Sequence, residues 1–211
     1  MIFNSWVSTV IICLIVAAFW IAFERSKPSA SRLVLVSELC ALAIGVRSVF
    51  SFVPYFNPLL AVIFLSGVAL GGVEGFLIGS LTALLSNFIF GQGPWTLYQM
   101  VSWGFAGTAG GVLAGTGILK KCDWKTGDYV RGSLVSVFLI IFVTGPLADL
   151  SGFFMMGERN LALLKVILAG GFAMNVSLAA STVFALCIIA RPFLFSVQRA
   201  VTKSRDFTQN R

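Results

Sequence analysis

Neutral polar side chains gather at one break in the apolar part of the chain. Residues 86–99 read SNFIFGQGPWTLYQ and interrupt a hydrophobic stretch that extends from residue 67 to residue 115. Glycine and proline end helices, and a helix that ends inside a membrane leaves backbone groups that need partners. Amides both donate and accept hydrogen bonds. This break therefore predicts a site where a membrane helix stops and presents polar groups to a ligand.

Arg47 and Asp149 are charged residues that fall near the ends of apolar segments. A charge inside a membrane costs roughly 2.5 to 3.5 kcal/mol on insertion scales unless it is paired or hydrated. The two residues lie at matching predicted depths, so we expect them to form an ion pair at the wall of a ligand cavity. A purely structural bridge accounts for such a pair about as well as ligand contact does.

Amides and aromatic rings near the segment ends are further candidates for ligand contact. Amides suit an amide-rich ligand, and rings can form a wall for a flat ring system. Trp95 and Tyr98 stand at the same break as two of the amides, which predicts one cluster. The competing explanations are interhelical hydrogen bonds for Asn87 and Asn175, and an interfacial belt for the rings. The candidates, beside Arg47 and Asp149, are Tyr55, Phe56, Asn57, Asn87, Gln92, Trp95, Tyr98, Gln99, Trp103, Phe153 and Asn175.

The sequence lacks the residue patterns that most catalysis requires. It has no histidine, no glycine-rich phosphate loop, no serine nucleophile elbow and no two carboxylates close together inside a span. Its cysteines, at positions 13, 40, 122 and 187, are too dispersed to form a metal set. We therefore predict a protein with no enzymatic activity, metal or cofactor of its own, so any ATP hydrolysis must come from a partner.

Composition favours a membrane protein. Of the 211 residues, 58% are hydrophobic and only 11% are charged, too few to cover an apolar core with polar surface in water. The net charge of +7 comes from basic residues that flank apolar segments, which is typical of membrane orientation rather than nucleic-acid binding. The predicted fold class is an all-α integral membrane protein.

Seven apolar spans follow from the hydrophobic pattern and its glycine and proline breaks. They cover residues 2–23, 33–50, 59–70, 76–90, 97–119, 132–150 and 161–190. With seven crossings, the basic residues at 25–32, 120–131 and 191–205 all fall on one side, which is therefore predicted to be cytoplasmic. The N-terminus is then outside, the C-terminus is inside, and the nearly uncharged connections 51–58, 91–96 and 151–160 form the external face, where we expect the ligand.

Residues 65–79 and 86–99, together with Arg47 and the aromatic and proline-rich loop that follows it, resemble the substrate-binding S components of energy-coupling factor (ECF) vitamin transporters. Three short motifs in and just after the break look most like the cobalamin-type S component: SNF at residues 86–88, FGQGPWT at residues 90–96 and QM at residues 99–100. The resemblance covers about residues 30–205. It implies a six-helix core at 31–195, an extra N-terminal transmembrane helix and linker at 1–30, and a basic cytoplasmic tail at 196–211.

The same resemblance implies a mechanism. An S component of a bacterial plasma membrane binds its vitamin externally, here vitamin B12 (cobalamin), and topples when it is docked on a module of one transmembrane coupling protein and two ATPases. In the family, a small-residue Ala-x-x-x-Ala motif contacts the coupling protein. Here Ser37, Ala41 and Gly45 form a comparable stripe four residues apart, with glycine in place of the second alanine. Packing within the monomer explains the stripe equally well.

Three alternatives remain from the sequence. The ligand can be another vitamin or precursor, for example queuosine, pantothenate or a pyrimidine precursor, because a charge-poor cavity excludes few neutral molecules. An intramembrane enzyme is disfavoured by the missing histidine and paired acids. A structural membrane subunit without a ligand would bind none of a panel of vitamins.

Overall fold

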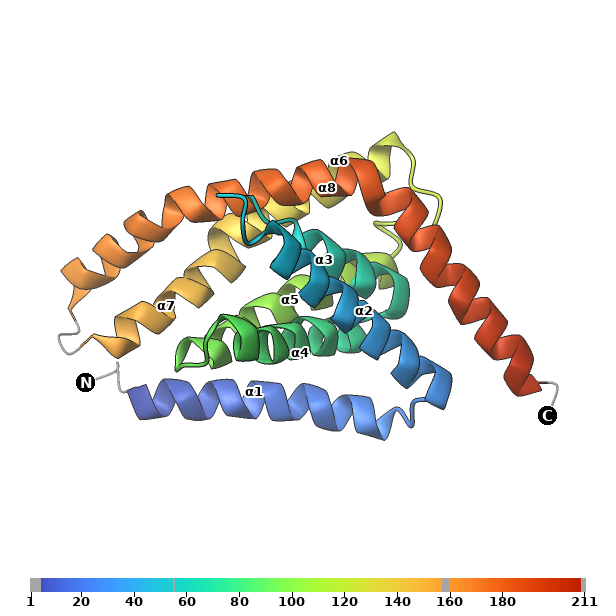
Figure 1. The fold of residues 1–211 in the computed structure, drawn as a ribbon, viewed down its shortest axis with the longest axis horizontal. Coiled ribbons are helices and arrows are strands. Elements are labelled where there is room, and N and C mark those ends of the chain that lie inside the picture. Colours follow the sequence, from blue (N-terminus) through green and yellow to red (C-terminus); the bar gives the residue numbers. More distant parts are fainter. Residues whose placement is uncertain (1–4, 55, 157–159, 210–211) are drawn as a thin grey trace.

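The computed structural model describes residues 5–54, 56–156 and 160–209, and in these ranges the chain forms helices and no strand (Figure 1). The all-α prediction is therefore confirmed for the described residues. The elements are α1 (Ser5–Arg25), α2 (Ala30–Phe50), α3 (Leu59–Leu70), α4 (Gly72–Phe90), α5 (Trp95–Gly115), α6 (Thr126–Leu139), a π-helical turn η1 (Ile140–Thr144), α7 (Gly145–Met155) and α8 (Leu161–Gln209).

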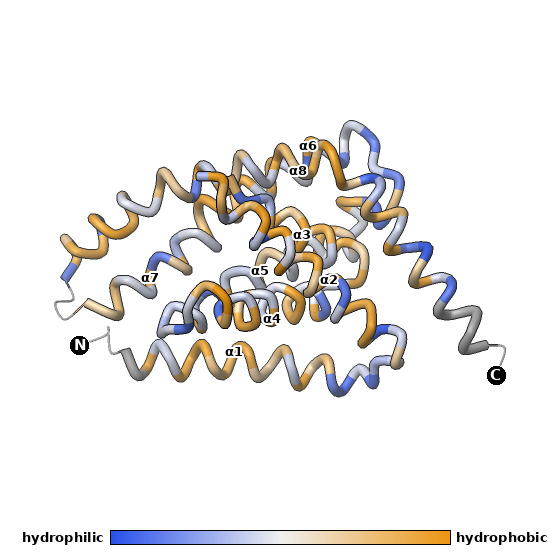
Figure 2. The backbone as a smooth tube through the Cα atoms, in the orientation of Figure 1, coloured by the Kyte–Doolittle hydropathy of each residue, from blue (hydrophilic) through white to orange (hydrophobic). Residues whose placement is uncertain are grey.

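Long apolar helices indicate a multi-pass membrane protein. Five helical segments in the described residues are long and apolar enough to cross a membrane, namely Val7–Arg25, Ala30–Phe50, Gly72–Phe90, Thr126–Met155 and Leu161–Lys203. Of the seven predicted spans, α3 is too short and α5 is not among the five. Figure 2 shows hydrophilic segments at the α1–α2 connection, before α6 and in the last part of α8, all at the same end of the molecule.

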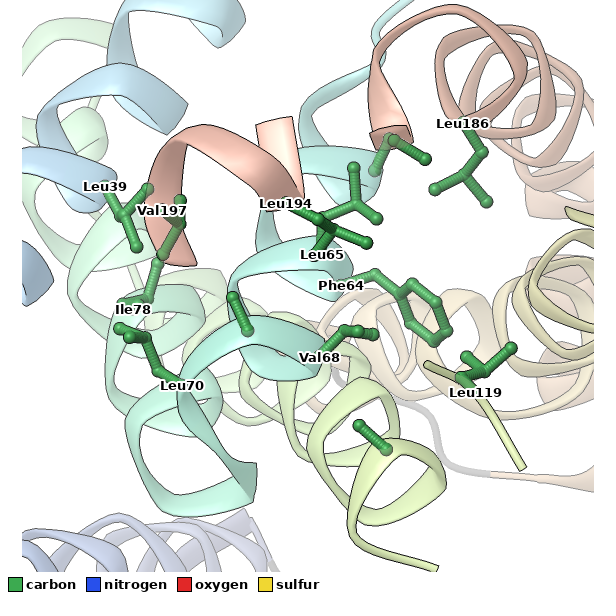
Figure 3. Close-up of a cluster of buried hydrophobic side chains, with 14 of the residues drawn as sticks. Leu39, Phe64, Leu65, Val68, Leu70, Ile78, Leu119, Leu186, Leu194 and Val197 are labelled. Atoms are coloured by element: carbon green, nitrogen blue, oxygen red, sulfur yellow. The ribbon is translucent and has the colours of Figure 1, made fainter. Parts of the chain in front are cut away.

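The short helix α3 is the centre of the bundle. All 12 of its residues are buried. A helix of that length rises only about 18 Å, less than the roughly 30 Å of hydrocarbon in a bilayer, so it is covered by protein and not by lipid. Figure 3 shows Phe64, Leu65 and Val68 of α3 among side chains of the neighbouring helices, including Leu186 and Leu194 of α8.

Glycines bring α3, α4 and α5 into direct backbone contact. A Cβ atom at Gly75 would lie 2.5 Å from the carbonyl oxygen of Gly107, and one at Gly67 would overlap the same carbonyl group. Gly111 meets the backbone of Gly72 in the same way. Small residues let helix backbones approach closely in membranes. Gly107 and Gly111, both in the fifth predicted span, therefore serve close packing of α5 against α3 and α4.

Two predicted starts of helices are wrong by four residues or more. The fourth span begins at Gly72 and not at residue 76, because Gly71 alone makes the turn with a φ of 128° that favours glycine. The sixth begins at Thr126 and not at residue 132. Asp128 accepts a hydrogen bond from the Lys125 backbone amide at 3.0 Å, so the polar residues 126–131 form the first turns of α6.

Three predicted ends are also wrong by four residues or more. The fifth span ends at Gly115, four residues early, and the sixth continues through η1 and α7 to Met155. The seventh does not stop at residue 190, because α8 runs through Pro192 to Gln209. Proline lacks a backbone donor and typically kinks a helix, and α8 bends in its C-terminal half (Figure 1). The predicted boundary between core and tail, at residues 195 and 196, falls inside this helix.

The N-terminal helix α1 packs along α4 and α5. The ring of Phe19 stacks on that of Phe76 with centroids 3.7 Å apart, and Ile12 is buried against α5. Its other face carries exposed apolar side chains such as Leu14 and Val10. This face suits contact with lipid.

Replacing Gly107 by alanine is expected to lower the free energy of unfolding by about 1 to 3 kcal/mol, because the added methyl group must push α5 away from α4. Gly115→Ala is the matched control, since it lies in the same helix and no atom lies within 4 Å of its added Cβ. Thermal unfolding of detergent-purified variants, followed by circular dichroism, measures the difference. Equal melting temperatures for the two variants would contradict the packing described above.

Candidate functional site

The guanidinium group of Arg47, in the last turn of α2, is held by neutral partners. Its Nη1 donates hydrogen bonds to Ser86 Oγ and to Asn87 Oδ1, the second at 2.8 Å. Its central carbon lies 4.5 Å from the ring centroid of Phe90 and 4.9 Å from that of Trp103. Hydrogen bonds and ring faces thus compensate the charge that the membrane would otherwise penalise.

The predicted ion pair between Arg47 and Asp149 is wrong. Among the described residues, the salt bridges join Arg32 to Glu74 and Arg191 to Asp123. A matching predicted depth says how far two residues lie along the membrane normal, but not which helices they face. Arg47 faces Asn87 of α4, whereas Asp149 faces Asn175 of α8. Glu74 is buried, with its carboxylate 3.0 Å from the Arg32 guanidinium group.

Asn87 is the hub of a hydrogen-bond network that we call the Arg47 cluster: Arg47, Ser86, Asn87, Gln92, Thr96 and Gln99. Its side chain accepts from Arg47 and donates to Thr96 Oγ1 at 2.9 Å and to Gln99 Oε1 at 2.8 Å. Thr96 in turn donates to Gln92 Oε1 at 2.9 Å. Asn87 is only 1% exposed, so both of its amide hydrogens and its oxygen need these partners. Figure 1 shows that the three helices that supply the cluster, α2, α4 and α5, lie together.

The loop after α2 is tied to the cluster through Asn57. Its side-chain amide donates to the backbone carbonyl oxygen of Arg47 at 3.5 Å, and its backbone carbonyl accepts from Ser181 Oγ of α8 at 2.9 Å. The ring of Phe56 lies between those of Phe50 and Phe184, at 5.4 and 5.7 Å. Tyr55, the other predicted ring of this loop, lies outside the described residues.

Tyr98 and Trp95 do not join the amides of the break, which corrects the predicted single cluster. Tyr98 is 4% exposed and faces α1, where its hydroxyl lies 2.8 Å from Ser8 Oγ. Trp95 folds back over its own loop, with its indole donating to the Gly91 carbonyl at 3.3 Å. Successive helix residues point about 100° apart, so Tyr98 and Gln99 face different neighbours.

A cavity of about 440 Å³ opens on the Tyr98 side, between α1, α5 and α7. Its lining includes Thr9, Tyr98, Ser151 and Phe154. The ring of Tyr98 stacks near that of Phe154, with centroids 5.8 Å apart. A cavity of this size, with an apolar wall and a few hydroxyl groups, is of the kind that holds small molecules.

Asp149 and Asn175 form a second polar centre, between α7 and α8. The Asn175 amide donates to Asp149 Oδ2 at 2.9 Å. Gly145 and Gly171 allow this contact, because a Cβ at either position would overlap the Asn175 or the Asp149 side chain. Phe153 is also in α7, 1% exposed, with its ring edge-on to Phe154 at 5.4 Å.

Several polar residues near these centres are not among the predicted site residues, although Ser86 and Thr96 belong to the 86–99 break. Thr144, in the π-helical turn, accepts at its carbonyl a hydrogen bond from Ser102 Oγ at 2.5 Å, and its own hydroxyl has no partner in the described part of the chain. Ser86 and Thr96 belong to the Arg47 cluster. The sequence signal that could have identified them is their position, since Ser86 is next to Asn87 and Thr96 is next to Trp95. Hydroxyls inside apolar helices usually bond their own backbone, as Ser86 also does, so the signal is weak.

The small-residue stripe of α2 is open. Ser37, Ala41 and Gly45 are exposed, and nothing lies within 4 Å of a Cβ added at Gly45. The alternative that the stripe packs within the monomer is therefore wrong. Glu38, on the same helix, is exposed as well.

The groups that gather in the described residues are amides, hydroxyls, aromatic rings and single charges, which bind and orient a molecule through hydrogen bonds and stacking. No three His, Cys, Asp or Glu side chains among them lie close enough to hold a metal ion. In comparisons with known proteins, no family model, no curated protein and no solved structure matches the chain.

Removing Arg47 and Asn87 together is expected to cost less stability than the sum of the two single changes. Arg47→Met leaves the Asn87 side-chain oxygen buried without a donor, and Asn87→Leu removes one of the two side-chain acceptors of the Arg47 charge, each costing about 2 to 4 kcal/mol. The double variant removes both penalties. The sum of the two single losses in unfolding free energy should therefore exceed the loss in the double variant by at least about 1 kcal/mol. Unfolding by sodium dodecyl sulfate in mixed micelles measures all three.

The control for this cycle pairs Arg47→Met with Asn175→Leu, which the structure places in a separate polar centre. Their effects should add within about 0.5 kcal/mol. Additive effects for Arg47 and Asn87 as well would show that the two side chains do not interact.

Proposed function

We propose that this chain is the substrate-capture (S) subunit of an ECF-type importer and that it binds vitamin B12. The observation that carries the proposal is the Arg47 cluster. Arg47 and five residues of the 86–99 segment, among the residues on which the resemblance to cobalamin-type S components rests, come together in one hydrogen-bonded network built by α2, α4, α5 and the loop between α4 and α5.

The location of the cluster suits capture from outside the cell. Asn87 lies 15 residues along α4 from Gly72, or about 22 Å of helix rise, so it is near the end opposite the basic connections. Basic residues favour the cytoplasmic side of a membrane. The cluster, the Asn57 loop and the cavity beside Tyr98 then belong to the external half of the protein.

The chemistry of the cavity at Tyr98 and of the Asp149–Asn175 centre suits cobalamin. Its corrin ring is broad and flat and carries several amide side chains, which match the ring-lined cavity at Tyr98 and the carboxylate and amide of Asp149 and Asn175. Cobalamin is larger than a cavity of about 440 Å³. In this proposal the connection at 91–94, whose Pro94 lines the cavity, moves as a lid over the ligand.

The open face of α2 supports a coupling partner. In this proposal the six-helix core consists of α2, α3, α4, α5, the continuous crossing from α6 to α7, and α8, with α1 as the extra helix. Ser37, Ala41 and Gly45 leave a shallow face on the outside of that core, where the helix of a coupling protein can approach closely. The two ATPases of the coupling module supply the energy that this chain does not.

Purified protein is expected to bind cyanocobalamin in equilibrium dialysis, and Asp149→Asn is expected to weaken that binding about tenfold. Asp149 is half-buried, and Asn175 occupies one of its oxygens, which leaves the other available to a ligand amide. Glu38→Gln, an exposed acid on α2, should bind like the unchanged protein. Binding of a different vitamin from the panel would reassign the substrate, and binding of none by folded protein would favour a structural subunit.

Ala41→Leu is expected to reduce uptake of labelled cobalamin at least about tenfold in cells that hold the coupling module, while leaving its binding to the purified protein unchanged. The larger side chain stands on the open face and blocks close approach of a partner helix. Leu42→Phe adds volume at an exposed position about 100° around the same helix and serves as the control. Normal uptake by the Ala41 variant would contradict the coupling role of this face.

A further inference from the structure

A second cavity, of about 330 Å³, opens at the basic end of the bundle, far from the Arg47 cluster along α2. It is lined by polar and basic side chains from α2, the connection before α6, and the last part of α8, together with the end of α3. The residues that concern its chemistry are Ser29, Arg32, Lys121, Gln198 and Thr202.

The fold fixes the orientation of the polar groups around this cavity. Arg32 Nη2 donates to the Leu70 carbonyl at 3.2 Å and pairs with Glu74 at 3.0 Å, which leaves its remaining N–H groups free to donate elsewhere. The Gln198 amide donates to the Ala69 carbonyl at 3.2 Å, so α8 is tied to the end of α3. The cavity is therefore a built feature with an oriented guanidinium group in its wall.

Lys121 supplies a positive charge without a counter-ion. It makes no ion pair in the described part of the chain, whereas Arg32 is balanced by Glu74 and Arg191 by Asp123. The hydroxyls of Ser29 and Thr202 add neutral polar groups to the lining. An ammonium group, a guanidinium group and hydroxyls around a small cavity are the groups that bind a phosphate.

The surroundings add further positive charge and an apolar surface. An adjoining cavity of about 560 Å³ shares Gln198 and Thr202 and is lined by Arg199, Lys203 and Phe195. Phe195 is 59% exposed. A phosphate in the first cavity would thus have an apolar surface beside it, on which a hydrocarbon chain can lie. This surface favours the phosphate group of a lipid over a free phosphate ion, which has no hydrocarbon chain.

We propose that this cavity binds the phosphate group of an anionic phospholipid from the leaflet at the basic end of the protein. Basic pockets between helices at the cytoplasmic side of a membrane are suited to anionic headgroups, since anionic lipids are attracted there. The proposal is independent of the vitamin site, because none of its residues belongs to the Arg47 cluster or to the Asp149–Asn175 centre.

Native mass spectrometry of the purified full-length protein, without any partner subunit, tests this proposal. The detergent-solubilised protein is titrated with dioleoylphosphatidylglycerol or with dioleoylphosphatidylcholine. We expect about tenfold tighter binding of the anionic lipid, and we expect Lys121→Gln to reduce that affinity about tenfold. Lys120→Gln removes the same charge from the neighbouring residue, which does not line the cavity, and should change the affinity less than about twofold.

Each other outcome overturns the proposal. Equal binding of the two lipids, or equal effects of the two lysine variants, would show that general positive charge and not this cavity retains lipid. A parallel titration with inorganic phosphate alone separates the sources of the phosphate group. If phosphate binds in a manner that depends on Lys121 while the anionic lipid does not, the ligand is a soluble phosphate compound and the lipid assignment is wrong.

Discussion

Direct backbone contact between α3, α4 and α5 is the constraint on which the rest of the structure depends. Gly67, Gly75 and Gly107 meet with no room for a side chain, and Gly71 turns the chain between α3 and α4 in one residue. These contacts bury a helix too short to cross a bilayer and hold α4 and α5 together along their length. The C-terminal end of α4 therefore lies beside the N-terminal end of α5, where the polar break is. Without this packing, Asn87 and Gln99 would not meet.

Among the described residues, the charge of Arg47 is accommodated without a carboxylate. A hydroxyl, an amide and two ring faces surround it, and the amide is itself fixed by Thr96 and Gln99. A network of neutral groups around a cation keeps its net charge, so this region remains attractive to electron-rich groups of a ligand. Asp149 lies instead between α7 and α8 with Asn175, which separates the two charges into different parts of the bundle.

The sequence predicted much of this arrangement, but only where local patterns decide it. Hydropathy predicted the all-helical membrane class, and the glycine and proline break predicted where α4 ends and α5 begins. The pairing of Arg47 with Asp149 failed because hydropathy predicts depth but not which face of a helix a residue occupies. The joint cluster of Tyr98 with Gln99 failed for the same reason, since α1 covers one face of α5 and α4 the other. The continuation of α8 through Pro192 depends on packing of Leu194 and Val197 against the core, which no local pattern reveals.

The length of α8 has a mechanical consequence. Its apolar part, Leu161–Lys203, has 43 residues and would extend about 64 Å if straight, roughly twice the thickness of the hydrocarbon layer. Such a helix must tilt strongly or run partly along the membrane surface, and the amount of tilt depends on how thick the bilayer is. Asn175 and Gln198 both belong to α8 and lie on opposite sides of Pro192 along the helix. Bilayer thickness thus acts on both parts of α8 at once, and it helps to set the position of the Asp149–Asn175 centre relative to the cavity beside Gln198.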